Sequence, residues 1–285
     1  MTDLYKQYKN LLFRLAYQLT GSAADAEDAV QDVFIKVQHV SAERLTEPKA
    51  YLCKMMTNHC IDLLRSARKR REVYIGPWLP EPVYDGRLQE AEQHETLSYA
   101  MLVLLERLSP AERAVFVLRE ALCFDYPAIA ELTDKSEANC RKMMSRAKAK
   151  MGITEAELLE RGKINQQWIE QFIGALSLGK VELILSMLHE DVVLLSDGGG
   201  KVHAAVRPIM SAGRVAQFLL GIMRKAQQEG EDGLFLELAE MNGGAGVLVR
   251  QGGYVTTAAF VSMKQDKIQE IYIVVNPEKL AGIQA

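Results

Sequence analysis

The stretch "DYPAIAELTDKSEANCRKMMSRAKAKM", Asp125–Met151, decides how the helical half of this chain is interpreted. It predicts a short helix over Pro127–Leu132, a tight turn at Thr133–Lys135 and a second helix capped by Ser136. Apolar residues recur along the second helix at steps of four, three and four and form one buried stripe: Cys140, Met144, Ala147 and Met151. This pattern predicts a helix-turn-helix, and a helical hairpin with a solvated basic face is the alternative.

The opposite face of the second helix is polar and largely basic. Its residues are Glu137, Asn139, Arg141, Lys142, Ser145 and Arg146. A recognition helix needs this arrangement, because it lies in the major groove of DNA with its amino-terminal residues near the base edges.

A net charge of −3 conceals two basic segments. "RSARKRR", Arg65–Arg71, carries five positive charges in seven residues, and Lys135–Lys150 carries six against the single Glu137. One charged run is usually a solvated face. Two such runs, each on a predicted helix, favour binding to nucleic acid.

The residues before the first basic segment have helical periodicity throughout. A first helix ends at Gly21, Ser22 caps a second, and a third runs from Lys49 to about Glu72. In the third helix the inward positions are Leu52, Met55, His59 or Cys60, and Leu63. Asn58, Asp62 and Arg65 share another face, where Asn58 could read a base edge and cations beyond it would meet phosphate.

Prolines and glycines then interrupt the helices. "GPWLPEPVYDG", between Gly76 and Gly86, has three prolines and two glycines and predicts a semi-rigid linker. Helical periodicity returns from Leu88 to about Leu159. Within it Ser109 is an N-cap, Pro110 occupies the first helical position, and Glu112 completes a capping box.

The pattern changes after about residue 165, where two helices, Gln166–Leu178 and Val181–Leu188, precede short β-branched runs. Turns are predicted at the glycine pairs 243–244 and 252–253 and at Gln265–Asp266, which indicates an α+β domain with a meandering antiparallel sheet. "DGGGK", Asp197–Lys201, is expected to be a hairpin turn whose strand continues through "KVHAAV". It lacks the spacing of a phosphate-binding loop.

Other features restrict the class of protein. No segment has the roughly 20 consecutive apolar residues that cross a bilayer, and the amino terminus does not resemble a signal peptide, so an intracellular, cytoplasmic protein is expected. The cysteines have no metal-binding or disulfide spacing and are expected to be buried apolar residues: Cys53, Cys60, Cys123 and Cys140.

The order of these motifs resembles that of the extracytoplasmic-function sigma factors of bacterial RNA polymerase. "DAEDAVQDVFIKV" (25–37) is similar to region 2.2 of that family, "KAYLCKMMTNHCIDLLRSARKRR" (49–71) to regions 2.3 and 2.4, and residues 105–151 to regions 4.1 and 4.2. The resemblance implies promoter recognition, with the first helical domain at the −10 element and the second at the −35 element, and binding to the core polymerase through the β′ clamp helices and the β flap.

The resemblance also assigns residues to these contacts. Those implied at the β′ clamp helices are Asp25, Asp28, Gln31, Asp32 and Phe34. Those implied at the −10 strand are Asn58, Asp62, Arg65, Arg68 and Lys69. Those implied at the −35 element are Ser136, Glu137, Asn139, Arg141, Lys142 and Arg146. Two positions depart from the family pattern, Asp134 in place of the usual turn glycine and Met143 at a commonly basic position.

The carboxy-terminal half resembles the SnoaL-like extension, a ketosteroid-isomerase-like α+β cone, that is fused to one subgroup of these sigma factors. The resemblance is carried by "WLPEP" (78–82), "DGGGK" (197–201) and "NPEKL" (276–280), the last with Glu278 in place of the usual Asp. It implies intramolecular regulation without a separate anti-sigma protein. The residues implied are Trp78, Pro80, Asp197, Gly198, Gly199, Gly200, Lys201, Asn276, Pro277 and Lys279.

The predicted domains are therefore a region 2 helical bundle over 1–75, a linker over 76–94, a region 4 helix-turn-helix over 95–152, a connector over 153–164 and a SnoaL-like domain over 165–285. Asp197, His203, Tyr254 and Tyr272 could serve as acid or base in the cone, but no sequence pattern pairs them. We predict no catalytic residue, no metal and no cofactor. The alternative is a sigma factor whose extension is a small-molecule sensor or an enzyme.

Overall fold

The computed structural model describes residues 2–40, 45–87, 97–153, 166–228 and 235–284. The chain divides into two compact units. The helical unit comprises Met1–Val73, Asp85–Leu97 and Met101–Leu158, and the sheet unit comprises Tyr74–Tyr84, Ser98–Ala100 and Leu159–Ala285. The predicted linker is thus divided, and its first part belongs to the sheet unit. The predicted stretch 88–94 and nearly all of the connector over 153–164 lie outside the described residues.

The first three helices of the helical unit are α1 (Thr2–Thr20), α2 (Ala23–Val37) and α3 (Pro48–Arg71). Gly21 ends α1 with φ +71°, and the Ser22 side chain caps α2 by accepting a hydrogen bond from the Asp25 amide at 3.1 Å. In α3, Met55 and Leu63 are only half-buried, whereas the stripe Cys53, Met56, Cys60 and Leu64 is buried. The inward face is therefore rotated from the predicted one, because α3 packs on α1 and α2 and also on α5 and α6.

The second half of the helical unit contains four helices: α4 (Tyr99–Leu105), α5 (Pro110–Glu120), α6 (Tyr126–Thr133) and α7 (Glu137–Met151). The first two residues of α4 group with the sheet unit. A 3-10 turn, η2, precedes these helices at Asp85–Arg87. The capping box of Ser109 and Glu112 forms as predicted. Asp134 takes the left-handed conformation at φ +52°, and Ser136 caps α7. The predicted stripe of Cys140, Met144, Ala147 and Met151 is buried. The helix-turn-helix is confirmed.

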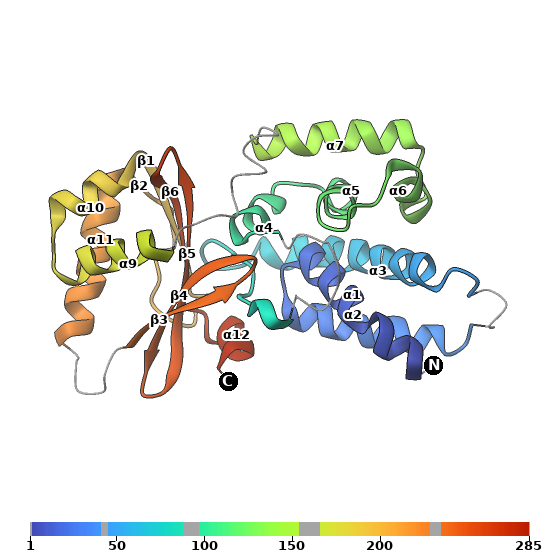
Figure 1. The fold of residues 1–285 in the computed structure, drawn as a ribbon, viewed down its shortest axis with the longest axis horizontal. Coiled ribbons are helices and arrows are strands. Elements are labelled where there is room, and N and C mark those ends of the chain that lie inside the picture. Colours follow the sequence, from blue (N-terminus) through green and yellow to red (C-terminus); the bar gives the residue numbers. More distant parts are fainter. Residues whose placement is uncertain (1, 41–44, 88–96, 154–165, 229–234, 285) are drawn as a thin grey trace. The chain divides into compact units, whose positions relative to one another are not determined.

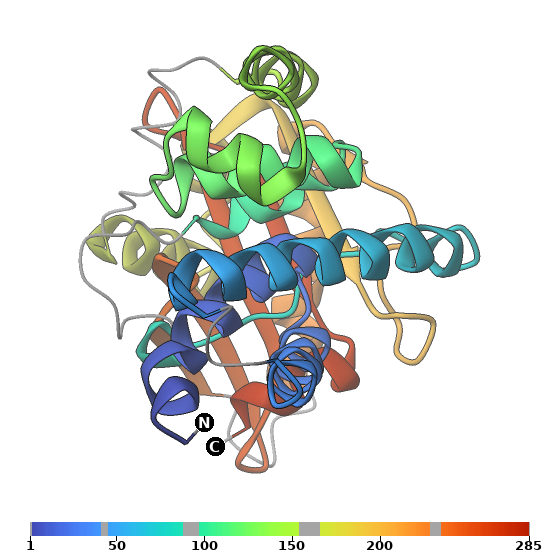
Figure 2. The ribbon, with the colours of Figure 1, turned by 90° about the vertical axis from the view of Figure 1, so that its right-hand side faces the viewer.

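Within the helical unit, α3 lies between α1 and α2 on one side and α5 and α6 on the other (Figure 2). We call the contact of α5 and α6 with α1 and α3 the seam. Lys54 of α3 and Asp134 after α6 form an ion pair of 2.6 Å at its edge. The buried Arg14 belongs to α1 and the buried Arg113 to α5, two of the helices that meet at the seam.

The sheet unit contains a six-stranded sheet of order β2-β1-β6-β5-β4-β3 (Figure 1). Its strands are β1 (Leu188–Asp197), β2 (Ile209–Met210), β3 (Phe235–Met241), β4 (Gly244–Gln251), β5 (Tyr254–Lys264) and β6 (Lys267–Val274). Its helices are α9 (Gln166–Ser177), α10 (Val181–Met187), α11 (Ala212–Gln228) and α12 (Pro277–Leu280), followed by the 3-10 turn η3 (Ala281–Ile283).

Two sequence-based expectations for this unit are wrong, and one helix was missed. The sheet is mixed, because β1 pairs with β6 in parallel. No strand forms over Lys201–Val206, because the Lys201 and Val202 amides fold back to the Gly198 carbonyl, and β2 begins only at Ile209. Helix α11 was not predicted, although its apolar positions recur at helical spacing. The turns at Gly252–Gly253 and Gln265–Asp266 do have positive φ, while the first glycine turn falls at Asn242–Gly243.

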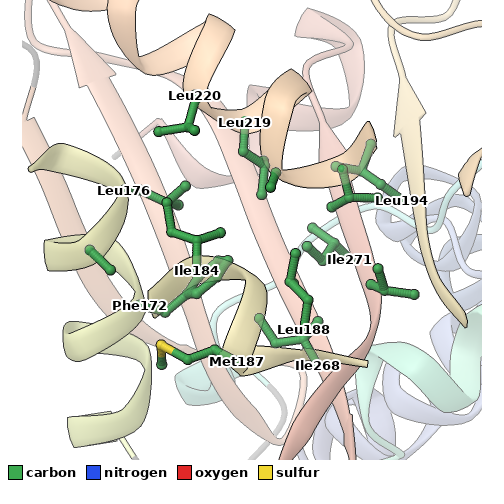
Figure 3. Packing of buried hydrophobic residues seen from close by; sticks show 14 of the residues in the cluster. Phe172, Leu176, Ile184, Met187, Leu188, Leu194, Leu219, Leu220, Ile268 and Ile271 are labelled. Carbon is green, nitrogen blue, oxygen red and sulfur yellow. The ribbon is translucent and has the colours of Figure 1, made fainter. Parts of the chain in front are cut away.

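The core of the sheet unit lies between the sheet and the three helices α9, α10 and α11. Phe172 and Leu176 of α9, Leu219 of α11 and Ile271 of β6 are among its side chains (Figure 3). Successive residues of a strand point to opposite faces, so Phe260, beside the core residue Ala259, points to the other face, where it stacks on Tyr99 with ring centroids 3.8 Å apart. At Phe260 the second face of the sheet is thus covered as well.

Three of the four cysteines are buried and one is exposed. Cys53, Cys60 and Cys140 are buried as expected, and burial raises the pKa of Cys53 to about 12, but Cys123 is exposed and has φ +54°. Cys123 lies three residues after the end of α5, and its left-handed backbone turns the chain toward α6. Among the described residues no helix combines the length and apolarity needed to cross a bilayer, and no group of side chains could hold a metal ion.

Candidate functional site

The segment Tyr74–Tyr84 comprises the last two residues of the predicted region 2 domain and the first part of the predicted linker, and it belongs to the sheet unit. We include Tyr74 and Ile75 in the linker from here on. The prolines of this segment exclude a helix and leave its backbone groups to find partners elsewhere. The Val83 amide donates a hydrogen bond to the Asn242 side-chain oxygen, and the Val83 carbonyl accepts one from the Asn242 amide, both at 3.1 Å. Tyr84 forms an antiparallel β-bridge with Met241. Leu79 and Val83 are buried. The segment therefore packs as an element of the sheet unit.

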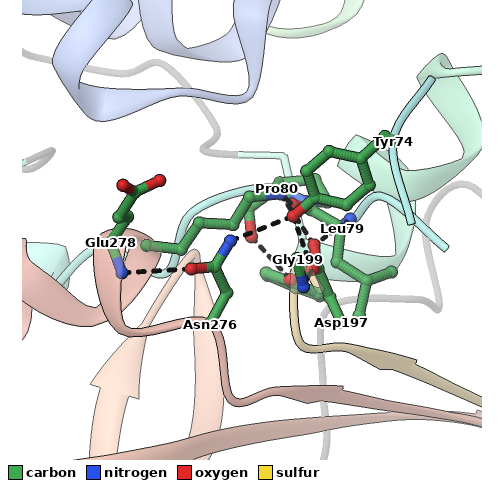
Figure 4. Close-up of polar contacts among 9 residues, drawn as sticks. Tyr74, Leu79, Pro80, Asp197, Gly199, Asn276 and Glu278 are labelled. Carbon is green, nitrogen blue, oxygen red and sulfur yellow. Dashed lines mark hydrogen bonds and ion pairs between the residues drawn. The ribbon is translucent and has the colours of Figure 1, made fainter. Parts of the chain in front are cut away.

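Asp197, the last residue of β1, is the centre of the polar contacts that hold this segment (Figure 4). Its side chain is fully buried and accepts hydrogen bonds from the Tyr74 hydroxyl at 2.7 Å, the Leu79 amide at 2.8 Å and the Gly199 amide at 3.0 Å. Lys279 forms an ion pair with it at 2.7 Å. We call this site the linker clamp: Asp197, Gly198, Gly199, Gly200, Asn276 and Lys279 around Tyr74, Trp78 and Leu79.

Lys279 neutralises the buried carboxylate from α12. Its ammonium also donates to the Leu79 carbonyl and lies 3.9 Å from the centre of the Trp78 ring and 5.2 Å from that of Tyr74. An ammonium over an aromatic face is attracted by the ring, most strongly when water is excluded, and here Lys279 is only 7% exposed. One cation thus contacts both the carboxylate and two aromatic residues of the linker.

Asn276 connects the end of β6 to the clamp. Its side-chain oxygen accepts from the Glu278 amide at 3.1 Å and caps α12, which places Lys279 in the first turn of that helix. Its side-chain amide donates to the Tyr74 hydroxyl at 3.0 Å, and its backbone amide donates to the Asp197 carbonyl at 3.0 Å. Outside this buried set, Lys201 pairs with Glu278 at the surface.

The three glycines are required by close approach as well as by the turn. A Cβ on Gly199 would lie 2.3 Å from Asn276 Nδ2 and 3.0 Å from the Tyr74 hydroxyl, and a Cβ on Gly200 would lie 2.7 Å from the Ile75 side chain. Both residues also have positive φ. A Cβ on Gly198 would lie 2.6 Å from the Val202 carbonyl oxygen. The linker therefore packs on bare backbone that no other residue type could provide.

In the helical unit, the exposed face of α7 is the one predicted to meet DNA. The six residues assigned to the −35 element are exposed. The Arg141 guanidinium lies 4.2 Å from the centre of the Tyr126 ring and 3.4 Å from Glu137, so both groups orient it. Met143, the departure from the family pattern, is 8% exposed and belongs to the core.

On α2 and α3 the predicted contact residues are also at the surface, with one exception. Asn58, Asp62 and Arg65 are exposed, the last two joined by an ion pair of 2.9 Å, whereas the side chains of Arg68 and Lys69 lie outside the described part of the structure. On α2, Asp28, Gln31 and Asp32 are exposed and Asp25 is half-buried. Phe34 is buried against Tyr5, with ring centroids 4.9 Å apart, so it supports this surface from below.

Comparison with known proteins agrees with this arrangement. The family model of Sigma-70 region 2 matches residues 4–70, and that of Sigma-70 region 4 matches residues 98–151. The chain is 32% identical to the ECF RNA polymerase sigma factor SigJ of Mycobacterium tuberculosis, over 98% of this chain and 92% of SigJ. This chain belongs to the extracytoplasmic-function sigma factors. The likeness extends through the carboxy-terminal domain.

The solved structure of SigJ and one further relative support the same assignment. The crystal structure of Mycobacterium tuberculosis SigJ aligns with a TM-score of 0.77 and 27% identity and covers 99% of both chains. The probable ECF sigma factor SigI of the same species is 24% identical over 99% of this chain and 95% of its own length. This sigma factor thus consists of region 2 and region 4 helical domains with a SnoaL-like α+β domain.

The structure brings together most of the residues that the family resemblance implied for regulation. Trp78, Asp197, the three glycines, Asn276 and Lys279 meet in the clamp. Lys201 lies at its rim, Pro277 begins α12, and the Pro80 carbonyl accepts from the Tyr99 hydroxyl at 2.7 Å. Tyr74, Leu79 and Tyr99 were not predicted. Tyr74 precedes the proline-rich stretch and Leu79 acts through its backbone, so neither carried a distinguishing signal.

The four residues weighed as catalytic groups lie in different surroundings. Asp197 is part of the clamp, and His203 lines a cavity in the sheet unit. Tyr254 is exposed, whereas Tyr272 is buried and donates a hydrogen bond of 2.7 Å to Glu270. Over its whole length this chain is related to SigJ, another sigma factor.

Proposed function

We propose that the SnoaL-like domain of this sigma factor regulates promoter recognition from within the chain, by holding the linker that joins its region 2 and region 4 domains. Promoter recognition for RNA polymerase follows from membership of the family. The observation that supports the regulatory step is the buried set of contacts from Asp197, Asn276 and Lys279 to Tyr74, Trp78 and Leu79.

The energetics of the clamp favour two distinct states, one with the linker bound and one with the linker released. Asp197 and Lys279 are both buried and are surrounded by donors and acceptors, so the captured state compensates the cost of their desolvation. Removing the linker would expose both charges to water and take away three of their partners. We propose that the captured linker restrains the two helical domains and that its release lets them reach the two promoter elements.

The contact residues implied by the family are part of the same proposal. The exposed face of α7 meets the −35 element, with Arg141, Lys142 and Arg146 supplying cations for phosphate and base edges. Asn58, Asp62 and Arg65 of α3 meet the −10 strand, followed by Arg68 and Lys69. Asp25, Asp28, Gln31 and Asp32 of α2, supported by Phe34, meet the β′ clamp helices. Region 4 contacts the β flap, and no separate anti-sigma factor is required.

The regulatory proposal is tested by transcription in vitro with purified core polymerase and a selected promoter library. Asp197→Asn keeps the shape of the side chain but removes the charge that pairs with Lys279, so we expect linker release and increased transcription. Asp191→Asn is the matched control, since Asp191 lies on the same strand and is exposed. Unchanged transcription by Asp197→Asn, with the linker cleaved faster by protease, would contradict regulation through the clamp.

The DNA contacts are tested separately by open-complex footprinting. Replacing Arg141 and Lys142 by Ala should abolish protection at the −35 element, because two cations that meet phosphate or bases are lost. The exposed pair Arg224 and Lys225 on α11, replaced in the same way, should leave the footprint intact. A footprint unaltered by the α7 substitutions would remove α7 as the recognition helix.

A further inference from the structure

The sheet unit contains a cavity of about 360 Å³ that the clamp does not use. It is lined by helices α9 and α11 and by the sheet, and Phe172, Leu176, Leu219 and Ile271, seen in Figure 3, are part of its wall. Protein interiors contain few voids larger than a water molecule. A space of this size, in the range of small-molecule sites, is therefore a feature that the fold maintains at a cost.

The wall of the cavity has a definite chemical character. Its sides are aliphatic and aromatic, supplied by α9, α11 and strands β3 to β6. Its polar groups are few, and the charged or ionisable ones are His203 and Lys225, both exposed side chains. Among the described lining residues none is acidic. An apolar body fits these walls, and an anionic group is complementary to the two basic residues.

We propose that this cavity binds an amphipathic carboxylic acid, with the apolar chain or ring system enclosed and the carboxylate beside His203 and Lys225. A hydrogen bond between a charged donor and a carboxylate is among the stronger polar interactions in proteins. The apolar body gains by leaving water in proportion to the area that it buries. Gln251, Thr256 and Thr257 supply further polar groups to the same lining.

Two segments that line the cavity continue directly into the linker clamp. His203 follows the glycine loop by three residues, and Val275 immediately precedes Asn276. A bound acid would therefore contact the loop that carries Gly199 and Gly200 and the segment that positions Asn276 and Lys279. A ligand shifts an equilibrium only by its different affinity for the two states. The regulatory consequence, occupancy changing linker capture, rests on the proposed function, whereas the binding site does not.

The binding site is tested with the full-length chain by isothermal titration calorimetry, using decanoate and decanol as probes. The two have the same apolar body and differ in the charge of the head group. We expect saturable binding of decanoate that is at least about tenfold tighter than that of decanol, since tenfold corresponds to about 1.4 kcal/mol and a charged hydrogen bond exceeds this.

Three variants locate the binding. His203→Gln with Lys225→Gln should weaken decanoate binding about tenfold and leave decanol binding unchanged, and Arg224→Gln, an exposed neighbour that does not line the cavity, should change neither. Ala259→Phe fills the cavity from β5 and should abolish binding of both probes, with folding checked by circular dichroism. If Ala259→Phe does not fold, the glutamine variants still decide the site.

Each outcome supports or overturns the proposal. Absence of saturable binding by either probe overturns the site, and equal binding of decanol and decanoate overturns the acidic head group. Binding that survives Ala259→Phe in the folded protein places the ligand elsewhere and also overturns the site. Transcription by Asp197→Asn is measured without any acid, so failure of the clamp proposal is distinguishable from failure of the ligand site.

Discussion

The linker clamp and the seam of the helical unit both bury charged side chains, but they surround them differently. In the clamp, Asp197 and Lys279 together contact the Tyr74 hydroxyl, the backbone of Leu79 and the ring of Trp78. At the seam, Arg113 pairs with Glu106, yet its Nε and Nη2, and those of Arg14, have no hydrogen-bond partner in the part of the chain that the structure describes. Burial lowers the pKa of both arginines, that of Arg113 to about 9.

This difference indicates which of the two contacts costs more free energy to open. A buried charge is tolerated when partners replace the water that it loses, and it costs free energy when they do not. Opening the seam returns Arg14 and Arg113 to water, which offsets part of the packing that is lost. Opening the clamp breaks a set of satisfied interactions. The buried charges of the clamp are thus better satisfied than those of the seam.

The largest effect is expected from Lys279→Met, which leaves the buried Asp197 carboxylate without its cation. We expect the free energy of unfolding of the sheet unit to fall by about 3–5 kcal/mol. Both tryptophans, Trp78 and Trp168, belong to this unit, so denaturation followed by fluorescence reports on it. The exposed Lys267→Met should change little. A loss below about 1 kcal/mol for Lys279→Met would make the clamp no stronger than a surface ion pair.

Next in size is the effect of a single methyl group on the glycine loop. Gly199 and Gly252 both have φ +59°, but a Cβ on Gly252 would meet nothing within 4 Å, whereas one on Gly199 would collide with Asn276. Each Gly→Ala change should cost about 1 kcal/mol for the left-handed backbone, and Gly199→Ala about 1–3 kcal/mol more for the collision. Equal melting shifts for the two variants would show that the linker does not press on the loop.

A smaller effect is expected at Glu112, a buried carboxylate of the helical unit that is well partnered. Its burial alone would raise its pKa, but hydrogen bonds from Lys150 and Ser109 outweigh this and lower the pKa below 4.5. The stability that it contributes is therefore present above about pH 4.5 and is lost as the pH falls through the folded-state pKa. Glu112→Gln should lower the free energy of unfolding by about 1–2 kcal/mol at pH 7. It should also make the fall of that free energy toward acid pH, the acid limb, less steep.

The control for Glu112→Gln is Glu131→Gln, an exposed carboxylate on α6. It should leave both the stability at pH 7 and the acid limb close to those of the unsubstituted chain. An acid limb as steep in Glu112→Gln as in the unsubstituted chain would show that this carboxylate does not keep its partners in solution.

The smallest effect, and one of opposite sign, is expected from Arg14→Met at the seam. Methionine fills a similar volume and removes a buried charge, so the free energy of unfolding should stay within about 1 kcal/mol of the original value or rise. The exposed Arg65→Met is the control. Chemical denaturation followed by far-ultraviolet circular dichroism gives the value, and a loss above about 2 kcal/mol would mean that the seam is as well matched as the clamp.

Short-range features were predictable from the sequence because their causes lie within a few residues. The caps at Ser22, Ser109 and Ser136 and the left-handed turn at Asp134 depend on contacts three or four residues apart. The parallel pairing of β1 with β6 and the contact of Asp197 with Leu79, 118 residues away, depend on the folded topology. The family resemblance grouped Trp78 and Pro80 with the glycine loop and Asn276, but no pattern in the sequence indicated that Tyr74 and the Leu79 backbone contact Asp197.

The capture of the linker also sets the reach of the chain. An extended chain spans at most about 3.3–3.6 Å per residue, so the 11 residues from Tyr74 to Tyr84 could contribute about 36–40 Å of tether between the region 2 and region 4 domains. While the sheet unit holds them, this length is not available. Releasing one short segment would therefore change the distance over which two DNA-binding domains can act together, and with it their effective concentration on one promoter.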